Sequence, residues 1–173
     1  MTLFFIILSI LLIQRGLELV AAKRNEKWMV NRGGLEFGKG HYKWIVLLHA
    51  GFFFFLSMEV LVTGAEFHPL WPIVISILLT AQLARYWVLL SLGKFWNTKI
   101  IILPGETMVK KGPYQWVKHP NYLIVAVEIL TIPLLFQAYY TAVIFSVLNS
   151  LLLIFVRIPK EEEALQFLLK GSD

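Results

Sequence analysis

Apolar residues form five long runs along this chain, and the segments between them hold most of the charged residues. Three runs, at about residues 3–20, 44–62 and 70–92, have close to the roughly 20 apolar residues that a bilayer-spanning helix needs. The last two, at about 122–136 and 139–155, are joined by Gln137 and Ala138. The run at 122–136 is short for a full crossing. The pattern therefore predicts a tight helical hairpin that is tilted or partly buried in protein.

A charged tail follows the hairpin, and residues 157–170 have the pattern of an amphipathic helix. The fold predicted from these elements is an all-α, polytopic integral membrane protein with about five transmembrane helices. We expect one membrane domain, 1–173, with three helices in 1–92 and a catalytic half in 93–173. Composition supports this class, because 58% of the residues are hydrophobic and 16% are charged, against about 45–50% and about 25% in soluble domains. The absence of cysteine excludes disulfides and thiolate chemistry.

The basic residues indicate how the chain is oriented. Outside the apolar runs, Lys and Arg occur only in residues 23–43, 93–118 and 157–170, and the loop at 63–68 has none. By the positive-inside rule, the N-terminus is outside and the C-terminus is cytosolic. The first run precedes its positive charges, so we expect an uncleaved anchor and not a signal peptide. Topology also explains the net charge of +5, and we expect no nucleic-acid partner.

Several ionisable residues lie within the predicted spans, where such groups are functional candidates. Arg15 and Glu18 lie on one face of the first predicted helix, near the helix end that is predicted to be cytosolic. They fit either a mutual ion pair whose charged groups reach toward the membrane interface or a functional site. Arg85 and Glu59 have no assigned role. Glu128 has no obvious local partner and is predicted to face a cavity.

A first candidate site is the segment at 112–122, directly before an apolar helix. Pro120 keeps His119 out of the α conformation, which places the imidazole on a bend at the helix entrance. Amides at that helix N-terminus can receive an anionic group, and Tyr114, Trp116 and Tyr122 can supply faces for a heteroaromatic ring or a cation. The alternative is that these residues are ordinary interfacial anchors.

A second candidate site is the start of the tail, where Arg157 precedes three adjacent carboxylates at residues 161–163. Carboxylates beside an anionic inner leaflet indicate a ligand with donors to satisfy; the alternative is a solvated first helical turn. Arg157 can orient a carboxylate or another oxyanion. No metal-ligand spacing is present, so no metal is expected.

Together these segments resemble the isoprenylcysteine carboxyl methyltransferase family and its phospholipid methyltransferase relatives, in their small bacterial form. The resemblance rests on Gly-Pro-Tyr-x3-Lys-His-Pro-x-Tyr at 112–122, the helical hairpin, and Arg-x3-Glu-Glu-x2-Leu at 157–165. It covers roughly the last 70 residues well. Two positions depart from the family pattern: Lys118 stands where Arg is usual, and Ile124 where Gly is expected.

The resemblance implies that S-adenosylmethionine is the methyl donor and is held on the cytosolic side by the loop and the tail. The cofactor-binding residues that it implies are Met108, Val109, Tyr114, His119, Pro120, Tyr122, Glu161 and Glu162. Those from 108 to 114 would line the nucleoside region, those from 119 to 122 would close the pocket, and the two carboxylates would bind the polar end. The catalytic candidates are Arg157, facing the acceptor, and Glu128, as a base for an alcohol.

The resemblance further implies a lipophilic acceptor that enters from the bilayer of a bacterial cell membrane, with the active site facing the cytosol. O-methylation of a small lipid such as an alkylpyrone is favoured over methylation of isoprenylcysteine, and N-methylation of a phospholipid is third. Two other classes stay open: an NADPH-dependent enzyme like the membrane sterol reductases, which also carry His-Pro-Asn-Tyr before a final hairpin, and a non-enzymatic membrane scaffold. The oligomeric state cannot be predicted from the sequence.

Overall fold

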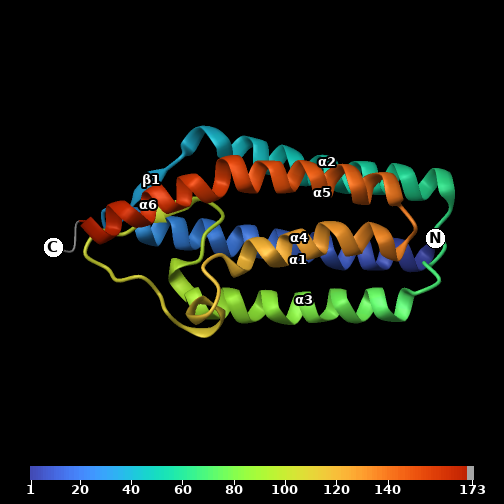
Figure 1. Ribbon diagram of the computed structural model, residues 1–173, viewed down its shortest axis with the longest axis horizontal. Helices are drawn as coiled ribbons and strands as arrows, with labels where there is room; N and C mark the ends of the chain where they lie inside the picture. The colour runs from blue at the N-terminus through green and yellow to red at the C-terminus, as the bar shows by residue number, and fades with distance from the viewer. Residues whose placement is uncertain (171–173) are drawn as a thin grey trace.

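The computed structural model describes residues 1–170, which form an elongated bundle of helices (Figure 1). The helices are α1 (Thr2–Val30), α2 (Tyr42–Thr63), α3 (Trp71–Leu92), α4 (Pro120–Leu135), α5 (Tyr139–Leu152) and α6 (Ile158–Lys170). Within this part of the chain, four helical segments are long and apolar enough to cross a membrane, and α4 is a shorter apolar helix. The predicted all-α polytopic membrane fold is confirmed.

The outer faces of the bundle are apolar. Leu17, Leu83 and Leu90 are 66%, 71% and 80% exposed, respectively. A soluble protein rarely exposes large contiguous apolar surface, whereas lipid tails cover it without cost. The chain is therefore an integral membrane protein.

The two ends of the bundle differ in character. The N-terminus lies at one end, together with the α2–α3 loop and the α4–α5 turn (Figure 1). The C-terminal helix and the long segments at 31–41 and 93–119 lie at the other end. All three basic segments of the sequence thus belong to one end. The assignment of that end to the cytosol stays a prediction.

Helix α4 is short, and much of its surface is covered by protein. Eight of its 16 residues are buried, and it lies between α3 and α5, both of which it contacts (Figure 1). A tight turn at residues 136–138 joins it to α5, with Gln137 at a φ of 58°. The hairpin and its partial burial are as predicted.

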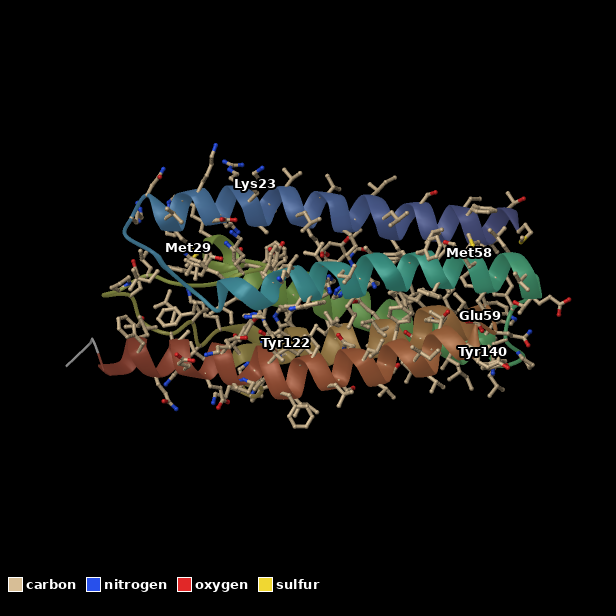
Figure 2. The ribbon with its side chains drawn as sticks, turned by 90° about the horizontal axis from the view of Figure 1, so that it is seen from above. Lys23, Met29, Met58, Glu59, Tyr122 and Tyr140 are labelled. Atoms are coloured by element: carbon tan, nitrogen blue, oxygen red, sulfur yellow. The ribbon has the colours of Figure 1, made fainter. Side chains whose placement is uncertain are left out.

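The start of α5 is held by Glu59 of α2. Its carboxylate accepts hydrogen bonds from the backbone amides of Tyr140 and Thr141, at 3.0 and 2.7 Å, and from the Thr141 hydroxyl at 2.6 Å. Figure 2 shows Glu59 beside Tyr140 at this end of the bundle. A carboxylate suits a helix N-terminus, where amides lack partners and the dipole is positive. Glu59, which had no assigned role, is a helix cap.

The predicted tail helix is not a separate element, because α5 continues into α6 through a π-helical turn at Leu153–Arg157. Pro159 gives the physical reason. It has no N–H to donate to the carbonyl of Phe155, which a regular α-helix would pair four residues later. The widened turn ends at Arg157, whose side chain is buried.

A two-stranded antiparallel sheet, absent from the predicted fold, covers the loop end of the bundle. Strand β1 (Leu35–Phe37) pairs with β2 (Ile100–Ile102), with Leu35 opposite Ile102. Ile100 and Ile102 pack on Ala164 of α6. The sheet ties the 31–41 segment to the 93–119 segment and joins both to the final helix.

Candidate active site

The two motif segments meet at a cavity of about 190 Å³ at the loop end of the bundle. Its walls come from the end of α1, the loop from 95 to 109, the segment from 112 to 122, and the helix that ends the chain. Of the residues predicted to bind cofactor, those that line it are Met108, Val109, Tyr114, His119, Tyr122 and Glu161. Arg157 lines it as well. The fold thus gathers residues up to 139 positions apart, from Met29 to Leu168, around one space.

Gly112 sets the path of the first motif segment across α3. Its φ is +54°, and a Cβ there would lie 2.1 Å from the Ser91 hydroxyl and 3.0 Å from Nε1 of Trp87. Only glycine fits this close approach. The chain then runs through a short 3₁₀ turn at Gly112–Gln115 and begins α4 at Pro120. These constraints deliver Tyr114 and His119 to the cavity.

Three side chains form a polar cluster in the cavity wall. The rings of His119 and Tyr122 stack with centroids 5.5 Å apart, and the Tyr122 hydroxyl donates a hydrogen bond to Glu161. Nδ1 of His119 lies 3.7 Å from Oε1 of Glu161. The Glu161 carboxylate, assisted by Glu162, raises the pKa of His119 above its ordinary value, against the opposite effect of burial. Burial raises the pKa of the Tyr114 phenol, which stays neutral.

Arg157 anchors this cluster from behind. Nε donates to the Tyr122 hydroxyl at 2.9 Å and Nη2 to the carbonyl of Thr98 at 2.9 Å. Nη1 lies 3.1 Å from Nε2 of His41. Each of the three guanidinium nitrogens therefore already has a protein partner. The sequence had suggested that Arg157 faces the acceptor, and it gave no sign of these partners.

The three adjacent carboxylates of α6 have different surroundings. Glu161 lines the cavity. Glu162 lies beside it and binds Nζ of Lys118 at 2.6 Å, with Nε2 of His119 at 3.5 Å. Glu163 is exposed and pairs with Lys160 at 2.7 Å. The solvated-turn interpretation thus fits Glu163, and Glu161 is the one of the three carboxylates that lines the cavity.

Some predicted site residues lie outside the cavity lining. Pro120 is buried at the first turn of α4, and Glu162 contacts the cavity only through its partners. Trp116 is 72% exposed and packs against Trp87, as an interfacial anchor would. Glu128 is buried inside the bundle and is not among the lining residues.

Glu128 belongs to a buried network of charges from three helices. Its Oε2 accepts from Arg15 of α1 at 2.6 Å and from Arg85 of α3 at 3.0 Å. Arg85 also holds both oxygens of Glu18, at 2.6 and 2.7 Å, and Gln82 donates to Oε1 of Glu128 at 2.7 Å. Arg15 and Glu18 do form the mutual pair considered from the sequence, at 2.8 Å. The two carboxylates and two guanidinium groups balance in charge.

Residues that the sequence reasoning missed complete the cavity. Asn121 lies inside the first motif segment, between two residues that were selected, and its amide was overlooked. Lys99 also lines the cavity and pairs with Glu26 of α1 at 2.7 Å. His41 lies behind Arg157 and belongs to the N-terminal half. No local pattern in the sequence marks Lys99 or His41.

The lining of the cavity holds side chains of both charges. The four lining side chains that can carry positive charge are Lys99, Lys118, His119 and Arg157. Each already has a protein partner, which for His119 is Glu162, at 3.5 Å from Nε2. Glu106 and Glu161 supply carboxylates. Two buried atoms of this lining, Nδ1 of His119 and Oδ1 of Asn121, have no hydrogen-bond partner among the described residues. Buried polar groups are normally paired, so the lining fits a ligand that carries hydrogen-bond donors and acceptors.

The two departures from the family motif are accommodated locally. Lys118 keeps its positive charge and contacts Glu162. Ile124 is buried against Ala81 of α3, with Ala84 packed at the same place. Small residues on α3 thus admit the larger side chain on α4, so the two helices still pack closely.

Comparison with known proteins identifies the family of the chain. The model of the isoprenylcysteine carboxyl methyltransferase (ICMT) family matches residues 73–167, a range that contains both motif segments and the hairpin between them. The chain belongs to this family. It is therefore a membrane methyltransferase by family, and the resemblance seen in the sequence is confirmed.

Two relatives extend the similarity beyond the matched range. The Bacillus subtilis protein described as "Uncharacterized protein YpbQ" is 47% identical over 163 residues, which cover 94% of this chain and 96% of that protein. An uncharacterized protein from Haemophilus influenzae is 30% identical over 150 residues, covering 86% of this chain and 87% of its own length. No solved structure matches the chain.

Proposed function

We propose that this ICMT-family protein is an S-adenosylmethionine-dependent methyltransferase that methylates an oxygen of a lipophilic acceptor. The observation that carries the proposal is the meeting of both motif segments around one cavity, with His119, Tyr122 and Glu161 in mutual contact. The segment 112–122 and helix α6 are separated in the sequence by the α4–α5 hairpin, yet both line the cavity. Their meeting is consistent with a pocket that holds a ligand.

The lining residues suit this cofactor. Glu161 supplies negative charge for its ammonium and sulfonium groups, and the unpartnered atoms of His119 and Asn121 supply polar contacts. Tyr114 and the apolar residues Met108 and Val109 supply surface for the nucleoside. Pro120 and Glu162 support this arrangement from outside the lining. When bound, S-adenosylmethionine supplies an electrophilic methyl group.

The protein's own contribution is positioning and exclusion of water. An acidic acceptor, such as a carboxylate or an acidic enol, is ionised at neutral pH and needs no base. Arg157 lines the cavity, and its three nitrogens hold it in place by contacts with Tyr122, His41 and the carbonyl of Thr98. Glu128 lies outside the lining and is engaged with two arginines, so the proposal assigns it no proton transfer. For a simple alcohol, His119 is the nearest base.

The surroundings favour an acceptor from the bilayer. The cavity is lined mainly by segments at the basic end of the bundle (Figure 1), and the outer faces of the bundle are apolar. In the proposed orientation, in a bacterial cell membrane, this end faces the cytosol. A water-soluble cofactor then reaches the site from the cytosol, and a lipid acceptor of the alkylpyrone or isoprenylcysteine type reaches it sideways.

Binding of the demethylated cofactor tests the proposal directly. Calorimetry on the detergent-solubilised protein is expected to show binding of S-adenosylhomocysteine and none of NADPH. His119→Ala and Glu161→Ala should each weaken this binding by at least about tenfold, since each removes a charge-assisted contact. Glu163→Ala is the matched control, because Glu163 is exposed and faces Lys160.

Transfer of labelled methyl groups from S-adenosylmethionine into a membrane lipid extract then identifies the acceptor. Binding of NADPH alone would favour the reductase class. Full affinity in both His119→Ala and Glu161→Ala would overturn the proposed cofactor site. No label in any lipid fraction, with no cofactor binding, would favour the scaffold.

A further inference from the structure

His41 contacts the proposed site from outside the segment that the family model matches. It ends a short 3₁₀ turn (Lys39–His41) directly before α2, and its side chain is buried. Gly38, at a φ of +64°, packs against the ring: a Cβ there would lie 2.3 Å from Cε1 of His41. The backbone is thus shaped to admit the imidazole at this place.

The contact between His41 and Arg157 determines the protonation state of the imidazole. Nε2 of His41 lies 3.1 Å from Nη1 of Arg157. A guanidinium group has donors and no acceptor and stays charged at all accessible pH values, so Nε2 must be the acceptor. The ring is then neutral, with its proton on Nδ1.

Protonation of His41 would remove this hydrogen bond and place two cations in contact. The charged groups that face His41 are Arg157, from the π-helical turn, and Lys160, from α6. Both are positive, so nothing among these neighbours compensates an imidazolium. The contact therefore holds at neutral pH and is lost in acid.

Arg157 passes the effect of His41 to the cavity. Its Nε donates to the hydroxyl of Tyr122, and that hydroxyl donates to Glu161. The guanidinium group thus contacts His41 through Nη1 and orients Tyr122 through Nε, and Tyr122 contacts the Glu161 carboxylate. Thr98 holds the third nitrogen through its carbonyl.

We propose that His41 is a positioning residue: its neutral ring holds Arg157 against Tyr122 and so keeps Glu161 in place for the cofactor. This inference rests on the proposed function. It also predicts that acid weakens cofactor binding through a residue of the N-terminal half, far in sequence from both motifs.

The experiment compares His41→Gln and His41→Leu with the wild type, with S-adenosylhomocysteine as the probe, from about pH 8 to about pH 5. The Gln side-chain oxygen can accept from Arg157 but does not titrate. His41→Gln is therefore expected to bind as the wild type does at neutral pH and to lose less affinity in acid. His41→Leu should bind at least about fivefold more weakly at neutral pH, because a hydrogen bond to a charged group is lost.

Controls separate His41 from other causes. His119 also titrates, but it is present in every protein compared, so the difference between wild type and His41→Gln reports on His41. His68→Gln is the matched control, because His68 belongs to the α2–α3 loop, which lies at the opposite end of the bundle (Figure 1), and its Nδ1 accepts a hydrogen bond from the amide of Leu70. It should keep the wild-type pH profile.

Nitrogen NMR of the four histidines, assigned by substitution, reads the contact without any cofactor. We expect the Nδ1–H tautomer for His41 at neutral pH. The inference would be overturned by an Nε2–H tautomer of His41. It would also be overturned if wild type and His41→Gln lost the same affinity in acid, or if His41→Leu bound as tightly as the wild type. Absence of binding by the wild type at every pH, with the tautomer as expected, would instead overturn the proposed function, and with it the positioning role.

Discussion

Replacing Glu128 with Gln tests whether this residue is structural or catalytic. Glu128 is 1% exposed and bonds two guanidinium groups. The substitution keeps the shape but leaves Arg15 and Arg85 opposite the single carboxylate of Glu18. Breaking a buried ion pair from one side costs about 3–5 kcal/mol, which lowers the melting temperature of a chain of this size by on the order of 10 °C.

Thermal unfolding in detergent measures this change. The chain has six tryptophans and no cysteine, so intrinsic fluorescence is a suitable probe and thiol-reactive dyes are not. Binding of S-adenosylhomocysteine to Glu128→Gln should persist below its melting temperature, because Glu128 does not line the cavity. Glu163→Gln serves as the control for loss of an exposed carboxylate and should melt as the wild type does.

The double substitution Arg85→Gln with Glu128→Gln sharpens the test. It removes one charge of each sign and leaves the Arg15–Glu18 pair, at 2.8 Å, in place. The loss of stability should then be smaller than the sum of the single losses by about 1–3 kcal/mol. An unchanged melting temperature in Glu128→Gln together with complete loss of methyl transfer would refute this reasoning and identify Glu128 as a base.

Two further predictions concern other parts of the fold. Glu59→Gln removes the charge that caps α5. It should lower the free energy of unfolding by about 1–2 kcal/mol and leave cofactor affinity unchanged. Glu66→Gln, at an exposed position, is its control, and equal melting temperatures of the two variants would contradict the cap. The raised pKa of His119 means that its interaction with Glu161 stabilises the fold below the ordinary histidine pKa of about 6.5 and is lost as pH rises through the raised value. The gap in melting temperature between wild type and His119→Gln should therefore narrow from about pH 6 upward, and a gap that widens would be inconsistent with the pair.

Much of the fold could be predicted from the sequence because the bilayer imposes simple rules. A span needs a minimum length of apolar residues, and basic residues gather on one side. These rules located every long helix and the hairpin at 137–138. They could not show that α5 and α6 are continuous, because Pro159 is compatible both with the start of a new helix and with a π-helical turn.

The candidate site could be predicted in part for a related reason. The residues at 112–122 carry their own geometry, since Gly112 and Pro120 restrict the backbone before any tertiary contact forms. Glu161 and Glu162 were selected among three adjacent carboxylates only through the family motif. The roles of Glu162 and Glu163 differ because successive residues of a helix point in different directions, and the sequence does not show which direction faces the loop.

The sequence by itself determined the membrane class, the position of the spans, the side that carries the basic residues, and the segments that hold the proposed chemistry. Each of these depends on local composition or on short-range backbone restriction. Only the tertiary structure decided that Glu128 meets Arg15 and Arg85, that two short strands pair across the loop end, and that His41 contacts Arg157. Spanning helices are apolar on nearly every face, so their sequence pattern does not encode which face packs against which neighbour. The contacts within the bundle depend on the rotation of each helix about its own axis, which this pattern leaves open.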